Sequence, residues 1–158
     1  MLHYIVSENH SSLLALAGII FAFAATVFAT AKLADMLPKD GGREFAHDGK
    51  LSAGKPRGAG IIFVLAFSVA AFLFAPMKAE MAIYLILTII CMMTGFLDDS
   101  SKMPWGEYKK GFLDLCVAAL VAMTFLKYNP NTIELALFHV ELTIPPVLFA
   151  ILIVILVW

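Results

Sequence analysis

Apolar residues form long uninterrupted stretches along this chain, and most polar residues gather between them. The stretches cover residues 13–31, 58–77, 81–97, 111–126 and 142–158, and Asp114 is the one charged residue inside them. A helix that crosses a bilayer needs about 20 mostly apolar residues. Helices also satisfy their own backbone polar groups where lipid offers no partner. The pattern predicts an all-α integral membrane protein, with about five transmembrane helices in a single membrane domain, residues 1–158.

The segment just before the last apolar stretch, residues 127–143, has a different pattern. Ile133 and Leu135 alternate with other residues, and Val140 and Leu142 alternate in the opposite phase. A period of two is typical of a β-strand, and two such runs joined by a short connection indicate a hairpin. We therefore predict a small external β-hairpin here, followed by a helix that opens on two prolines.

Composition and charge support the membrane assignment. Of the 158 residues, 61% are hydrophobic and 15% are charged, whereas a soluble domain averages about 45–50% and about 25%. Nine Lys and Arg residues lie in segments 32–57 and 98–110, and two lie in the other connecting segments. This bias predicts that both basic segments are cytoplasmic loops and that the N-terminus is outside. We expect the lipid bilayer, and no nucleic acid, as a partner.

The first stretch does not have the features of a cleaved signal peptide. No Lys or Arg precedes it, so the basic n-region that such peptides carry is absent. We therefore predict that residues 13–31 are a transmembrane helix.

Asp98 and Asp99 are the first candidates for chemistry. They follow the third apolar stretch directly, where two adjacent carboxylates repel each other and are costly near lipid. A divalent cation relieves both problems, and Mg²⁺ is typically held by one or two carboxylates together with substrate phosphates. An ordinary solvated helix end explains the same two residues, so both interpretations stay open at this point.

Basic residues just before two predicted helices are candidates for phosphate binding. Lys55 and Arg57 lie between glycines before the second stretch, and Lys109 and Lys110 lie before the fourth. Helix N-termini favour anions, and Lys and Arg add charge-assisted contacts to phosphate. The competing explanation is positive-inside topology with contact to anionic lipid. Together with two acids on the same predicted membrane face, these cations indicate phosphoryl transfer at the membrane surface.

Two further titratable residues have more than one interpretation. Asp114 lies inside the fourth stretch, where it either pairs with Lys110, four residues earlier on a helix, or forms the wall of a site. His47 is a lone histidine in segment 32–57, and such a residue is more often solvated than functional.

Three motifs carry a resemblance to a known family: LPKDGGR at residues 37–43, GKPRGAG at 54–60 and GFLDD at 95–99. Together they resemble the polyprenyl-phosphate N-acetylhexosamine-1-phosphate transferases, over essentially the whole chain. The resemblance implies about ten spans in the bacterial inner (cytoplasmic) membrane, with both termini outside. It also implies Mg²⁺-dependent transfer of a phospho-sugar from a UDP-sugar to undecaprenyl phosphate, with release of UMP. In the best-known branch the transferred group is phospho-N-acetylmuramoyl-pentapeptide, and the product is lipid I of peptidoglycan synthesis.

The resemblance also assigns roles to individual residues. It places Asp98 and Asp99 at the active site, where one binds Mg²⁺ or activates the lipid phosphate, and it matches Lys55 to a basic active-site residue. Many members have Thr-Pro-Thr-Met-Gly-Gly where this chain has Lys-Pro-Arg-Gly-Ala-Gly, and their loop histidine is spaced differently from His47. Further Asn, Asp and His residues of the family lie beyond the fifth span. Since residue 158 also falls within an apolar run, we expect this chain to be an N-terminal fragment, inactive alone.

Other functions are compatible with the sequence. A related UDP-N-acetylhexosamine phosphotransferase would use the same residues. A transporter subunit would need polar residues at mid-membrane depth, for which Asp114 is the one candidate. A non-catalytic membrane assembly partner would use the charged loops to bind another protein, and a homodimer is one assembly that we consider.

Overall fold

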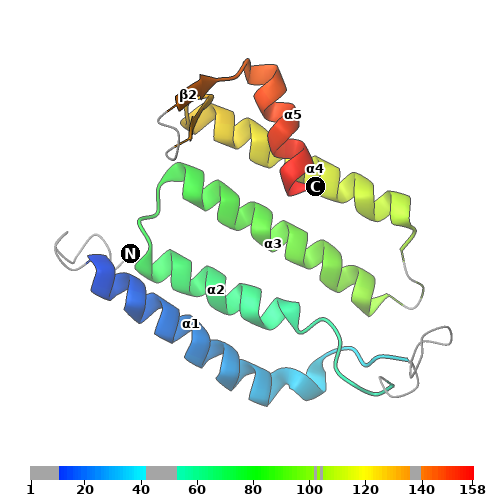
Figure 1. The fold of residues 1–158 in the computed structure, drawn as a ribbon. Coiled ribbons are helices and arrows are strands. Elements are labelled where there is room, and N and C mark those ends of the chain that lie inside the picture. The colour runs from blue at the N-terminus through cyan, green and yellow to red at the C-terminus, as the bar shows by residue number, and fades with distance from the viewer. Residues whose placement is uncertain (1–10, 42–52, 102, 104, 136–139) are drawn as a thin grey trace. The chain divides into compact units, whose positions relative to one another are not determined.

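The structure, a computed structural model, describes residues 11–41, 53–101, 103, 105–135 and 140–158. In chain order (Figure 1) its elements are α1 (Ser11–Leu33), the 3₁₀ turn η3 (Ala34–Met36), α2 (Gly60–Phe74), α3 (Ala79–Ser100), α4 (Glu107–Tyr128), β1 (Thr132–Leu135), β2 (Val140–Thr143) and α5 (Pro146–Val157). Helices dominate, and one two-stranded antiparallel sheet accompanies them. This confirms the predicted class, an all-α membrane fold with a small hairpin.

In the part of the chain that the structure describes, three helices are long and apolar enough to cross a membrane, within Ser12–Met36, Ala79–Ser100 and Glu107–Tyr128. The 22 residues of α3 and of α4 extend about 33 Å, and a bilayer's hydrocarbon core is about 30 Å thick. Large apolar side chains on α1 point outward, with Phe23 72% and Phe28 67% exposed. Such surfaces suit contact with lipid rather than with water.

The other two helices, α2 and α5, are apolar but shorter, with 15 and 12 residues. Local sequence explains their limits. The left-handed Gly58, with φ of +69°, precedes α2, and Pro76, which lacks a backbone N–H, follows it. Residues 140–143 form β2, so α5 begins only at Pro146. Proline is favoured in the first turn of a helix. The helical parts are therefore shorter than the apolar stretches 58–77 and 142–158.

The chain divides into two compact units, residues 1–77 with 92–104 and residues 78–91 with 105–158. In the first unit α1 and α2 lie side by side (Figure 1). Gly18 permits their close approach, since a Cβ at this position would lie 3.0 Å from the Cβ of Phe74. The Phe74 ring also packs against the Phe21 ring, with the centroids 5.6 Å apart. A small residue on α1 therefore sets how closely α2 can pack.

In the second unit α4 packs on α5, and the rings of Phe125 and Phe149 meet edge to face with centroids 5.7 Å apart. A polar cluster joins the start of α3 to the end of α4. Glu80 Oε1 accepts hydrogen bonds from the Tyr84 hydroxyl, at 3.0 Å, and from Asn129 Nδ2. These bonds to a carboxylate fix the two helix ends to each other within this unit.

The two strands of the hairpin pair apolar residues with apolar residues. Ile133 lies opposite Leu142, and Glu134 lies opposite Glu141. The backbone N–H of Ile144 donates to the Asn131 carbonyl at 3.0 Å, and Asn131 Nδ2 donates to the Ile144 carbonyl. Asn131 therefore closes the base of the hairpin just before α5 begins.

Candidate functional site

Short extended segments at the two ends of the loop between α1 and α2 pair with each other. Lys39 and Pro56 form an isolated antiparallel bridge. Backbone hydrogen bonds flank it, from Asp40 N to Lys55 O (2.9 Å), from Gly54 N to Asp40 O (2.8 Å) and from Arg57 N to Pro38 O (2.7 Å). This ladder fixes the backbone of the basic turn, residues 54–58, to the segment that follows α1.

Gly58 directs the chain from the basic turn into α2. Its φ of +69° lies in the left-handed region, which glycine adopts without a Cβ penalty. A Cβ there would lie 3.0 Å from Cδ2 of Phe96 and 3.8 Å from Oδ2 of Asp99. Glycine is therefore needed both for the backbone conformation and for the close approach of the turn to the end of α3. The neighbour that approaches Gly58 so closely is α3.

The last turn of α3 contains Asp98 and Asp99 and no basic residue. A helix C-terminus carries partial negative charge and favours cations, so two adjacent carboxylates here are unfavourable without a positive partner. Both acids are half-buried. Neighbouring helical positions differ by about 100° around the axis, so the two side chains leave the helix in different directions. The α3 terminus is thus a place where positive charge is stabilising.

Arg57 supplies positive charge to Asp99. Its Nη2 lies 3.0 Å from Asp99 Oδ1, and the two side chains are 40% and 32% exposed. Solvent screens a pair with this exposure, so its net contribution to stability is about 0–1 kcal/mol. The pair joins a predicted phosphate-binding residue to a predicted metal ligand 42 positions away in the sequence. Because the bond is weak, a ligand can compete for either partner.

The donor set at the end of α3 fits Mg²⁺ that arrives together with phosphate. Among the described residues there is no group of three or more His, Cys, Asp or Glu side chains that could hold a metal ion. Mg²⁺ does not need such a group, because it commonly takes one or two carboxylates and completes its six positions with water and substrate phosphates. Asp98 and Asp99 can supply the carboxylates.

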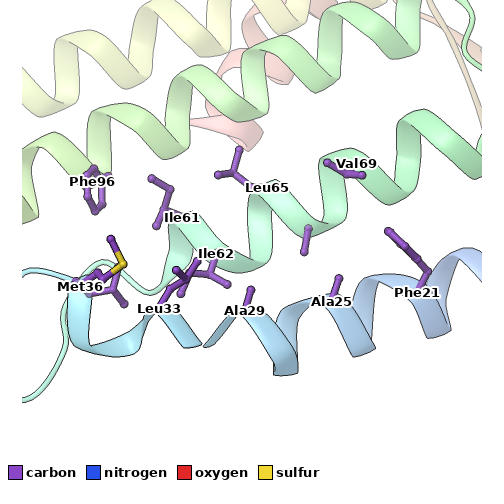
Figure 2. Close-up of a pocket in the computed structure, with 12 residues that line it drawn as sticks. Phe21, Ala25, Ala29, Leu33, Met36, Ile61, Ile62, Leu65, Val69 and Phe96 are labelled. Atoms are coloured by element: carbon purple, nitrogen blue, oxygen red, sulfur yellow. The ribbon is translucent and has the colours of Figure 1, made fainter. Parts of the chain in front are cut away.

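An apolar groove runs between α1 and α2 toward the basic turn (Figure 2). Its volume is about 430 Å³, and its lining includes Phe21, Ala25 and Ala29 of α1, Ile62 and Leu65 of α2, and Phe96 of α3. Phe96 lines one end of the groove and also contacts the position of Gly58. An apolar groove that ends beside a charged pair suits an amphiphilic ligand.

The other predicted site residues lie on the basic turn, on α4 or outside the described residues. Lys55 is exposed on the basic turn, two residues before Arg57. Lys109 and Lys110 belong to the second unit, where Lys109 Nζ lies 3.5 Å from the centroid of the Trp105 ring, in a cation–π contact. Asp114 is exposed on α4 within that unit. His47, for which the sequence left two interpretations, lies outside the described residues.

Comparison with known proteins supplies a partial match. No family model matches this chain, and no solved structure does. Two curated relatives match, both of them phospho-N-acetylmuramoyl-pentapeptide-transferases from strains of Treponema pallidum, one of which is the strain Nichols. Each is 46% identical over 86 residues, which cover 54% of this chain and 24% of the relative. The match spans about a quarter of the relatives' length, and over that part it confirms the resemblance that the three motifs indicated.

Proposed function

We propose that this chain contributes part of the active site of a phospho-N-acetylmuramoyl-pentapeptide transferase. The observation that carries the proposal is the ion pair between Arg57 on a glycine-bounded turn and Asp99 at the end of a membrane-crossing helix. It brings an anion-binding group and a metal-binding group to one place. The 46% identity to the two curated transferases supports the choice of reaction.

The proposed reaction moves phospho-N-acetylmuramoyl-pentapeptide from its UDP-linked form to undecaprenyl phosphate, giving lipid I and UMP. An oxygen of the acceptor phosphate forms a bond to the phosphorus that carries the sugar. The same phosphorus loses its bond to the oxygen that bridges it to UMP. Both substrates are anionic, so positioning and neutralisation of charge are what the protein must supply.

Different residues of this chain supply the positioning of the substrates and the neutralisation of their charge. Asp98 and Asp99 would hold Mg²⁺ together with substrate phosphates, or one of them would activate the acceptor phosphate. Bound Mg²⁺ would neutralise negative charge on the diphosphate as UMP leaves. Lys55 and Arg57 contact phosphate oxygens from the basic turn, and Lys109 and Lys110 are retained as phosphate-binding residues on the sequence pattern alone.

The charge distribution supports a membrane setting for the proposed site. The nine cations of segments 32–57 and 98–110 support a site at the cytoplasmic face of the bacterial inner membrane, with the N-terminus outside. The groove between α1 and α2 gives an apolar surface next to the Arg57–Asp99 pair. That combination supports an acceptor with a phosphate head and a long apolar chain.

A related UDP-N-acetylhexosamine phosphotransferase is the second candidate, because residues 55–60 depart from the pattern that many family members share. The two differ in the donor, so UMP release measured with different UDP-sugars separates them. A transporter subunit would instead move solute into liposomes, and an assembly partner would bind another protein without binding nucleotide.

Neutralising the two acids tests the proposal. In the complete protein, Asp98→Asn and Asp99→Asn should each lower the rate of UMP release at least about 100-fold, while the amount of folded protein in the membrane stays the same. Asp35→Asn is the matched control, because Asp35 is an exposed acid in η3 and is not part of the proposed site. Retained activity in both site variants would refute the assignment.

A further inference from the structure

We propose that Arg57 is an exchangeable counter-ion, which neutralises Asp99 before ligands bind and passes to a phosphate group when Mg²⁺ takes the Asp99 carboxylate. The inference rests on the proposed function and deepens it, because it assigns Arg57 a role in coupling two ligands. It predicts that Mg²⁺ and a nucleoside diphosphate bind more tightly together than either binds alone.

The geometry of the ion pair makes Arg57 and Mg²⁺ compete for Asp99. Arg57 Nη2 lies 3.0 Å from Asp99 Oδ1, so a Mg²⁺ held by the same carboxylate would stand close to the guanidinium. Two positive groups beside one carboxylate repel each other. The guanidinium therefore opposes the binding of Mg²⁺ when no anion is present. A diphosphate removes the conflict, because the guanidinium can bind phosphate oxygens with two parallel hydrogen bonds.

The surrounding structure lets the side chain exchange partners while the backbone stays fixed. The Arg57 N–H donates to the Pro38 carbonyl at 2.7 Å, and the next residue, Gly58, sits against Phe96. Rotation of the Arg57 side chain is therefore sufficient for the exchange. Its 40% exposure, and the 32% exposure of Asp99, mean that neither charge becomes buried without a partner when the pair separates.

The end of α3 needs a positive charge in both states. It has two adjacent acids and no basic residue in its last turn, at the negative end of the helix. Arg57 provides that charge before ligands bind, and Mg²⁺ provides it afterwards. The exchange therefore keeps this helix end neutralised while it releases a guanidinium to hold the diphosphate.

Binding measurements without turnover test the inference. Mn²⁺ replaces Mg²⁺ as a spectroscopic probe, and free Mn²⁺ is measured by electron paramagnetic resonance with the complete protein in detergent, with and without UDP. In the native protein UDP should raise the affinity for Mn²⁺ by about tenfold beyond Mn²⁺–UDP association in solution, within the usual range of coupling between two ligands. In Arg57→Gln, Mn²⁺ alone should bind about tenfold more tightly, and UDP should raise that affinity less than it does in the native protein.

Two variants control for charge. Arg57→Lys keeps a cation at the same place and should keep the direction of both native effects. Lys32→Gln removes an exposed cation from the last turn of α1 and should leave both affinities within about twofold, because salt screens an exposed charge that is not part of the Arg57–Asp99 pair.

Other results of these binding measurements would contradict the counter-ion exchange. Unchanged or weaker Mn²⁺ binding by Arg57→Gln contradicts the competition, and an equal gain in Lys32→Gln would mean that net charge alone is responsible. If Arg57→Gln does not fold, the native protein decides, because absence of a UDP effect on Mn²⁺ affinity overturns the exchange. UMP release is read separately. Coupling without UMP release refutes the proposed function alone, and UMP release without coupling refutes the counter-ion exchange alone.

Discussion

Replacing Gly58 with alanine perturbs the point at which the basic turn meets α3. Gly58 has φ of +69°, and a Cβ there would lie 3.0 Å from Cδ2 and 3.3 Å from Cε2 of the Phe96 ring. The alanine must therefore hold a left-handed backbone and also displace an aromatic ring by a few tenths of an ångström. We expect Gly58→Ala to lower the stability of the first unit.

The size of the effect follows from its two parts. A left-handed conformation costs a residue with a Cβ about 1–2 kcal/mol, and pushing the Phe96 ring away from its preferred rotamer costs about 0.5–1.5 kcal/mol. The sum is about 1.5–3.5 kcal/mol. Gly54→Ala is the matched control, because Gly54 has φ of +81° and nothing within 4 Å of the position of its Cβ. It should lose only the backbone part, about 1–2 kcal/mol.

The free energy of unfolding of the variants, measured by denaturant titration in detergent, separates the two parts. In a Phe96→Leu background the ring is gone, so Gly58→Ala should cost no more than Gly54→Ala costs in the native background. Equal losses in the two glycine variants of the native protein would refute the contact with Phe96. No loss in Gly58→Ala would refute the left-handed turn as well.

Further predictions concern the packing of the helices. Asn129→Ala should lower the free energy of unfolding by about 1.5–3 kcal/mol, because Nδ2 donates to the carboxylate of Glu80; a loss below about 0.5 kcal/mol in denaturant titration would contradict this contact. Gly18→Ala should lower it by about 1–3 kcal/mol, because the added methyl meets Phe74 Cβ at 3.0 Å. Gly111→Ala should instead raise it by up to about 1 kcal/mol, since the nearest neighbour of its Cβ is a Trp158 side-chain atom at 3.8 Å. A rise for Gly18→Ala would contradict the described packing of α1 on α2, and a loss for Gly111→Ala would contradict the open space at that position.

Local patterns in the sequence predicted the elements of the fold. The charge-free stretches predicted helices because lipid leaves the backbone no other partner. The change of phase in the apolar alternation predicted the hairpin, which pairs Ile133 with Leu142. Such features depend on residues close together in the sequence, so their period is visible without a structure.

The geometry of the candidate site depended on packing that no local pattern records. Arg57 and Asp99 were singled out separately, but 42 positions separate them, and their pairing depends on how Gly58 meets Phe96. The ladder between residues 38–40 and 54–57 was missed, although a signal for it exists. Leu37 and Lys55 both precede prolines, which favours extended backbone, and Leu37 is extended, with φ of −71° and ψ of 151°. Two such segments at the ends of one loop can pair.

The most direct test of the proposed function follows transfer of the sugar itself. Membranes containing the complete protein are given undecaprenyl phosphate and UDP-N-acetylmuramoyl-pentapeptide labelled in the sugar. We predict that label enters the lipid fraction with release of one UMP for each sugar transferred, that both stop when Mg²⁺ is chelated, and that Asp99→Asn abolishes both. If the native protein leaves all label in the aqueous fraction, while a known transferase assayed in the same membranes moves it to lipid, the proposed function is wrong.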